Sequence, residues 1–268
     1  PYCSVDVDDR LYVAALRGLV RLRRRVDFDV DTNTVSQLLN AEMLAMAADL
    51  LVLARGSWAE TRSIERSEAL FERALFDHVQ QRGERIFNLL SLLHDPADMR
   101  AAYRGARSPS KNVRASTLEF LDNILDRGEK RQLMALIEST DATEFAAAAH
   151  STFDLAKEDH AAVLQRHIQG KNEWLRAVSL WHVGHSGHKE MRPQVEMLAD
   201  DVSALSAAVA KRALEELDSP EKQELTMGLT VVEKVLKLQS VDVFKAASTD
   251  DLAHVAQIAE EVELAAEE

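Results

Sequence analysis

Three histidines recur at intervals of three residues, at His182, His185 and His188. Neutral imidazoles are common ligands of zinc and other divalent transition metals, and side chains three residues apart can share one face of a helix end. Glu190 follows closely, but no carboxylate has a matching spacing inside the motif. These histidines are therefore weak candidate metal ligands, and the alternative interpretation is that they are ordinary side chains at a helix end.

Glycines interrupt this histidine motif at Gly184 and Gly187. Because glycine lowers the stability of a helix, we expect the helix to break between His185 and His188. Three further histidines lie on neighbouring predicted helices and could approach the motif from there, namely His150, His160 and His167. The pattern as a whole favours the structural interpretation, and we predict neither a metal nor another cofactor.

Other arrangements that support catalysis are missing from the sequence. It contains no glycine-rich loop that would cradle a phosphate and no Gly-x-Ser-x-Gly turn, and no spacing of Ser, His and Asp selects a triad. The single cysteine, Cys3, excludes an intrachain disulfide and a cysteine-rich zinc site. The acidic run over residues 250–268 is typical of a solvated face. We therefore predict no catalytic or cofactor-binding residue and no enzymatic activity.

The chain is strongly acidic, with a formal net charge of −13 over 268 residues and a pI near 5.2. Such a surface repels a phosphate backbone, so we expect no nucleic-acid partner. No apolar run approaches the roughly 18 residues that cross a membrane, so we expect no membrane-spanning segment in residues 1–268. A local basic cluster from Arg21 to Arg25 suits either a solvated helix C-terminus or a contact with an anionic membrane or an acidic partner.

Helix-forming residues dominate the composition. Hydrophobic residues make up 46% of the chain and aromatic residues only 5%, with nine Gly and five Pro, which favours helices over sheets. Start signals and apolar spacing predict three long helices near 10–25, 31–55 and 60–93, the third with a break or bend at Gly83. We interpret residues 1–94 as an N-terminal cap built from these long helices.

Shorter helices follow in pairs. Pro and Gly residues that mark helix starts and ends predict four helix pairs. These are 96–106 with 109–126, 129–138 with 141–150, 157–168 with 171–184, and 188–199 with 201–217. The second helices recur at intervals of about 29, 33 and 34 residues, which is typical of an α-solenoid whose stacked pairs share one core. An irregular helical bundle is the alternative.

Three of the second helices carry the same apolar stripe. Its corresponding positions are Val113, Leu118 and Leu121, then Leu175, Leu180 and Val183, then Val209, Leu214 and Leu217. Arg114 and Arg176 follow the first apolar residue in two copies. The unit Val/Leu-Arg-Ala-x-x-Leu-x-x-Leu/Val resembles a HEAT repeat over residues 95–218, about four helix pairs. The resemblance implies an all-α, right-handed α-solenoid of HEAT-like (armadillo-type) pairs, in which Arg114 and Arg176 are structural.

The C-terminal segment, residues 219–268, resembles the start of a cyclic nucleotide-binding domain. A connector helix near 220–238 precedes a short helix ending at Phe244 and a helix with a Ser/Thr-x-x-x-Leu pattern from Ser248 to Leu252. The β-roll and the Gly-Glu…Arg cassette of that family have no counterpart in residues 1–268. No cyclic-nucleotide ligand is therefore carried over to any residue, and we expect no small-molecule ligand.

A HEAT array directly before such a domain resembles the soluble region of bacterial ATP/ADP translocase-like membrane proteins. The likeness rests on residues 85–90, 95–96 and 114–123. Because the chain starts at Pro1 without a Met, we interpret it as a fragment of a larger protein of this kind. The resemblance implies a cytoplasmic location, on the cytoplasmic face of the inner membrane.

The function implied is a non-catalytic scaffold or regulatory module that contacts another protein or neighbouring domains of its own chain. In that setting it would couple a membrane transporter-like domain to a cyclic-nucleotide sensor. The alternative from a different class is a metal-dependent or nucleic-acid-acting helical-repeat enzyme that uses His182, His185 and His188.

Overall fold

The structure, a computed structural model, describes residues 9–26, 28–54, 62–138, 142–218 and 229–262. Within these ranges every regular element is helical, with thirteen α-helices and two 3₁₀ helices and no strand, so the all-α prediction is confirmed. The elements are α1 (Asp9–Arg23), α2 (Thr32–Ala54), α3 (Arg62–Leu93), α4 (Pro96–Ala106), α5 (Lys111–Ile124), α6 (Arg127–Ile137), α7 (Ala142–Phe153), α8 (His160–Ile168), α9 (Glu173–Ser186), η1 (Lys189–Met191), α10 (Arg192–Leu198), α11 (Ala204–Asp218), α12 (Val231–Gln239), η2 (Asp242–Phe244) and α13 (Thr249–Ile258).

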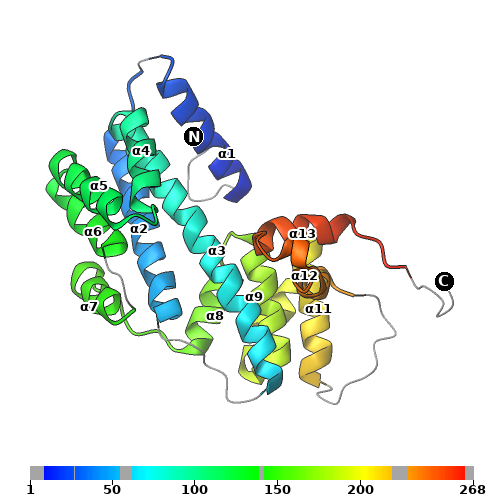
Figure 1. Ribbon diagram of the computed structural model, residues 1–268. Coiled ribbons are helices and arrows are strands. Elements are labelled where there is room, and N and C mark those ends of the chain that lie inside the picture. The colour runs from blue at the N-terminus through cyan, green and yellow to red at the C-terminus, as the bar shows by residue number, and fades with distance from the viewer. Residues whose placement is uncertain (1–8, 27, 55–61, 139–141, 219–228, 263–268) are drawn as a thin grey trace. The chain divides into compact units, whose positions relative to one another are not determined.

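Capping side chains set most helix starts. Asp95, for example, accepts hydrogen bonds from two backbone N–H groups of the first turn of α4. The predicted helix 157–168 begins later, at His160, because Asp159 is its N-cap. The expected break at Gly83 is wrong: α3 continues unbroken through it, and Figure 1 shows one long helix. A single helical glycine costs only about 1 kcal/mol, which burial of its neighbours can offset.

Some predicted features lie outside the described residues. They are Cys3, the first part of the connector near 220–238, and the last acidic residues, 263–268.

The chain divides into two compact units. Unit 1 comprises residues 1–56 and 78–157, and unit 2 comprises residues 57–77 and 158–268. Helix α3 contributes its N-terminal part to unit 2 and its C-terminal part to unit 1. This division cuts across the predicted segments 1–94, 95–218 and 219–268, which stay a prediction.

In unit 1, successive helices pack as α4 with α5 and α6 with α7, and α2 contacts both α6 and α7. The apolar core draws on every helix of the unit, and its fully buried members include Leu39, Met43, Leu90, Met99 and Leu121. Aromatic packing joins α3 to α4, where the rings of Phe87 and Tyr103 lie 5.3 Å apart. The unit therefore holds together by a continuous apolar core.

Helix α2 is long and apolar enough to cross a membrane by length and composition alone. No membrane-spanning segment is expected from the sequence, because that expectation considers only runs of apolar residues. In α2 two carboxylates, Glu42 and Asp49, interrupt the apolar run. In unit 1 those carboxylates pair with arginines of α3, while Leu39, Met43 and Ala47 are fully buried in the core. These contacts are those of the core helix of a folded unit.

Unit 2 is built around α9, which packs against α8, α11 and α12. Its buried residues surround the helix axis on most sides, including Trp174, Val178, Leu180 and Trp181. A helix that is apolar around most of its circumference must be covered by several neighbours. The position of α9, and so of the side chains on it, is therefore fixed by the neighbouring helices α8, α11 and α12.

Helices α5 and α9 share their local structure residue by residue. Arg114 donates to the backbone carbonyl of Ser108, and Arg176 donates to that of Gly170, in each case six residues earlier. Both helices begin after a capping side chain, Ser110 in α5 and Asn172 in α9, and both contain 14 residues. The two arginines therefore brace the turn before their own helix, as expected for structural residues.

The apolar stripe of α5 is less buried than predicted. Leu121 is fully buried and Leu118 is half-buried, but Val113 is 46% exposed. Val113 lies in the first turn of α5, where an open hollow of about 440 Å³ separates it from residues of α4. In α9 the corresponding residues are all buried, because α8, α11 and α12 cover that helix.

A histidine in unit 1 is expected to make stability depend on pH. His94 Nε2 lies 3.0 Å from Glu129 Oε2, and this hydrogen bond, with the nearby charge of Asp126, raises the pKa of His94 above 6.5 although burial opposes the shift. The protonated pair therefore stabilises the folded state below pH 6.5, and this contribution is lost as the pH rises through the raised pKa.

Chemical denaturation at a series of pH values would measure this dependence in the wild type and in His94→Asn. The free energy of unfolding of the wild type should decline above pH 6.5 more steeply than that of the variant. Parallel profiles for the two proteins would contradict the prediction.

Candidate functional site

The histidine motif lies at the end of α9 and in the turn that follows. His182 and His185 are on the helix, which ends at Ser186, and His188 lies beyond it. Gly187 adopts a left-handed conformation with φ 70°, and the N–H of His188 bonds to the carbonyl of Val183. This glycine-dependent helix end folds the chain back and returns His188 to the side of α9. The predicted break between the last two histidines is confirmed.

His160 joins two of these histidines from the start of α8. Its Nε2 lies 3.0 Å from Nε2 of His182, and the two rings stack with centroids 5.0 Å apart. The ring of His188 lies 5.0 Å from that of His160 and 6.3 Å from that of His182. One nitrogen from each of the three rings lies within 4.8 Å of the others.

The surroundings of His160 favour a neutral imidazole. Burial, together with the nearby His188, lowers the pKa of His160 to about 4. His182 is fully buried, and its ring packs against Phe71 with centroids 5.7 Å apart. A neutral imidazole keeps a lone pair, which is the form that binds a metal ion.

Glu190 completes the arrangement on the exposed side. His188 Nδ1 lies 2.7 Å from Glu190 Oε1, and the hydrogen bond from its own backbone, with that from His188, lowers the pKa of the Glu190 carboxyl. A carboxylate on one ring nitrogen sets the tautomer and leaves the other nitrogen to act as an acceptor or ligand. His188 is therefore presented to the cluster through Nε2.

His185 belongs to a different set of contacts. Its Nδ1 lies 2.7 Å from Glu216 Oε2 on α11, and its ring lies 4.0 Å from that of Trp181. The structure thus brings His182 and His188 together and places His185 apart from them. Among the other histidines considered, His167 packs edge-on against Phe71, and His150 contacts the carbonyl of Leu155 within unit 1.

The predicted pairing of helices could have identified His160 as a neighbour of His182. In two helices that pack in antiparallel fashion, the start of the first lies beside the end of the second. His160 is the first residue of α8 and His182 lies near the end of α9, and these two helices pack together. The spacing of histidines along one helix favoured His185 as a member of the cluster, whereas the pairing of α8 with α9 favours His160.

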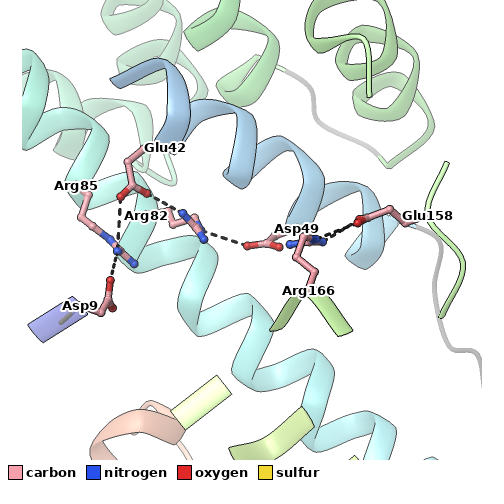
Figure 2. A network of polar contacts seen from close by, with 7 residues as sticks. All are labelled: Asp9, Glu42, Asp49, Arg82, Arg85, Glu158 and Arg166. Carbon is pink, nitrogen blue, oxygen red and sulfur yellow. Dashed lines mark hydrogen bonds and ion pairs between the residues drawn. The ribbon is translucent and has the colours of Figure 1, made fainter. Parts of the chain in front are cut away.

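A second polar cluster lies inside unit 1, between α2 and α3 (Figure 2). Arg82 donates to Glu42 at 2.8 Å and to Asp49 at 3.2 Å, and Arg85 donates to Asp9 at 2.6 Å and lies 3.6 Å from Glu42. These carboxylates are engaged by guanidinium groups, so the cluster is suited to holding helices together rather than to acid–base chemistry.

Figure 2 also draws a separate pair in unit 2, Glu158 and Arg166. The guanidinium donates two parallel hydrogen bonds to the carboxylate, at 3.1 and 3.0 Å. Such a bidentate pair fixes the segment before α8 to that helix, on which His160 lies.

The basic cluster predicted at the end of the first helix surrounds an open hollow. Arg21, Arg24 and Arg25 line it together with Gly18 and Leu22, and its volume is about 500 Å³. The arginines lie at the helix C-terminus, where the helix dipole favours positive charge. The hollow offers cations to solvent and carries no group for catalysis.

Comparison with models of protein families, with curated proteins and with solved structures found no match to the chain. The resemblances to HEAT repeats, to a cyclic nucleotide-binding domain and to ATP/ADP translocase-like proteins therefore stay expectations.

Proposed function

We propose that the chain is a non-catalytic helical scaffold of HEAT-like pairs, arranged as a right-handed α-solenoid, that mediates contacts with another protein or with neighbouring domains. The shared local structure of α5 and α9 supports the repeat interpretation, since cap, arginine brace and length correspond. The packing of α4 with α5, α6 with α7, α8 with α9 and α10 with α11 has the pairwise order that such repeats require.

The observation that carries the proposal is the anchoring of the C-terminal helix pair. Thr249, the first residue of α13, is fully buried, and its N–H and hydroxyl donate to Asp77 at 2.7 and 2.8 Å. Trp174 of α9 donates its indole N–H to the same hydroxyl at 3.0 Å. Thr249 therefore ties the start of α13 to both α3 and α9 within unit 2.

The segment from α12 to residue 262 also presents apolar side chains to solvent, in η2, at the end of α13 and in the stretch that follows it. Val243 is 80% exposed, Ile258 is 82% exposed and Val262 is 75% exposed. Contiguous exposed apolar patches are typical of surfaces that contact another protein or domain, and we propose that these three side chains contribute to one. The segment is thus anchored at Thr249 and exposes apolar side chains at other positions, an arrangement that suits coupling to a neighbouring domain.

The resemblance of residues 238–264 to the start of a cyclic nucleotide-binding domain gives this neighbour an expected identity. In that setting α12 and α13 would pass a ligand-dependent movement of the sensor to α9. The basic end of α1 suits a position on the cytoplasmic face of the inner membrane, near a transporter-like domain, because arginines are attracted to anionic lipid. Acidic charge over the rest of the chain supports a partner other than nucleic acid.

Thr249→Val is expected to weaken the anchor. The indole N–H of Trp174 loses its hydroxyl acceptor and Asp77 loses one donor, so the free energy of unfolding of unit 2 should fall by about 1–2 kcal/mol. Urea unfolding followed by the fluorescence of the buried Trp174 and Trp181 would measure the loss. Thr117→Val is the control, because the Thr117 hydroxyl bonds to the carbonyl of Val113 in its own helix. Thr117 lies in unit 1, so far-ultraviolet circular dichroism follows the unfolding of this variant, whose stability should change little.

The coupling itself is tested in the full-length protein by hydrogen exchange with and without cyclic AMP. We expect the nucleotide to alter amide exchange in α13 and α9 of the wild type, and only within the sensor domain in Thr249→Val. A reading frame that encodes no β-roll with a Gly-Glu…Arg cassette next to residue 268 would contradict the proposed neighbour. Unchanged exchange in α9 of the wild type would contradict the coupling.

A further inference from the structure

We propose that His160, His182 and His188 form a binding site for a divalent transition-metal ion of the zinc class. This inference is independent of the scaffold function, since it concerns the opposite end of α9 from the Trp174 contact. The three ligands come from three places in unit 2: the start of α8, the last turns of α9 and the turn after α9. A metal ion bound there would cross-link these three segments.

The distances between the ring nitrogens are close to those of a metal site. Two nitrogens bound to one tetrahedral zinc ion at about 2.05 Å are about 3.3 Å apart. Nε2 of His160 and Nε2 of His182 are 3.0 Å apart, and the nitrogen of His188 lies within 4.8 Å of both. A small movement of His188, which follows the helix end and is half-buried, would bring the third nitrogen to the ion.

The chemistry of the ligands also matches. Imidazole suits zinc, copper and nickel better than it suits magnesium or calcium, which prefer oxygen. Metal-binding histidines usually donate their second ring N–H to a carboxylate or carbonyl, and Glu190 holds Nδ1 of His188 in this way at 2.7 Å. The site thus offers three buried or half-buried imidazoles, one of which, His188, already has a supporting carboxylate.

The ligand set leaves one position of a tetrahedral ion to water or to another ligand. Three histidines plus an open position are typical of zinc sites that bind water, whereas closed structural sites use four protein ligands. Only binding of the ion is proposed, and no reaction is assigned to it. Its direct effect is to stabilise the contact of α8 with α9 by linking binding to folding.

Titration of the tag-free protein with Zn²⁺ by calorimetry near neutral pH tests the site. We expect one ion per chain at micromolar protein concentration and a rise in thermal stability in the presence of the ion. His188→Gln and His160→Gln should each abolish stoichiometric binding, and Glu190→Gln should weaken it about 10- to 100-fold. His188 and Glu190 lie at the surface side of the cluster, so these two variants should fold like the wild type.

His185→Gln is the matched control, because His185 is on the same helix and in the sequence motif but is paired with Glu216 instead. Binding in this variant should equal that of the wild type. Substitution by Co²⁺ gives a second readout, since a tetrahedral site with nitrogen ligands absorbs in the visible range and octahedral surface binding absorbs only weakly. Absence of stoichiometric binding to the wild type, its persistence in His188→Gln, or its loss in His185→Gln would each overturn the proposal.

Discussion

Replacing Arg82 with methionine is expected to lower the free energy of unfolding of unit 1 by about 3–5 kcal/mol. Arg82 lies between two carboxylates of α2, with Glu42 Oε2 at 2.8 Å and Asp49 Oδ2 at 3.2 Å. The side chain of Asp49 is fully buried and that of Glu42 is 11% exposed. Methionine fills much of the space of the arginine stem but supplies no charge, so the two carboxylates lose their shared counter-ion in a poorly solvated place.

The size of this effect follows from desolvation. An ion pair at the surface contributes at most about 1 kcal/mol, because water screens both charges and solvates each of them when the partner is removed. A carboxylate that is buried cannot recover its hydration, and removing its partner typically costs several times as much. Arg85 lies 3.6 Å from Glu42 and compensates only in part, since its closest partner is Asp9.

The measurement is urea unfolding followed by far-ultraviolet circular dichroism, together with hydrogen exchange in α2 and α3 to locate the loss. Arg17→Met is the matched control: Arg17 pairs with Glu84 on the same α3 helix, but their side chains are 51% and 40% exposed. It should cost at most about 1 kcal/mol. If Arg82→Met and Arg17→Met lower the free energy of unfolding equally, the buried ion pairs of Arg82 do not stabilise unit 1 more than a surface pair does.

The helices of this chain could be predicted from sequence because their signals are local. Capping residues such as Asp95 and Asn172, and a left-handed glycine such as Gly187, act within one turn of the helix end that they define. Apolar spacing then identified the buried faces of helices such as α9, whose neighbours cover most of it. The predicted burial was wrong at Val113, which lines an open hollow beside residues of α4 and does not pack into the core.

The site was less predictable because its members are distant along the chain. His160 and His182 are 22 residues apart, and only the packing of α8 on α9 makes their nitrogens neighbours. Similarly, the carboxylates of α2 gave no indication of their partners, since Arg82 and Glu42 are 40 residues apart. Pairing of helices is a property of the fold, and a sequence motif such as His182, His185 and His188 describes only one of the two helices.

Gly184→Ala is expected to destabilise unit 2 by about 2–3 kcal/mol, although alanine favours helices more than glycine does by about 1 kcal/mol. A Cβ atom at Gly184 would lie 2.8 Å from the Cα of Ala213 and 2.8 Å from Oε2 of Glu216. The first contact is with backbone, which cannot rotate away, so α9 and α11 must separate. That separation would also lengthen the contact between His185 and Glu216.

Gly18→Ala is the control for this substitution, because Gly18 lies inside α1 and a Cβ there would meet no atom within 4 Å. It should raise the stability of the protein by about 0.5–1 kcal/mol through the lower flexibility of the unfolded chain and the better helix propensity of alanine. Urea unfolding followed by far-ultraviolet circular dichroism measures both variants, and the fluorescence of Trp174 and Trp181, which are buried on α9, reports in addition on the unit that contains Gly184. Since both substitutions are glycine to alanine in a helix interior, the difference between them isolates the helix contact. A gain in stability for Gly184→Ala like that of Gly18→Ala would mean that α9 and α11 are not in backbone contact at this position.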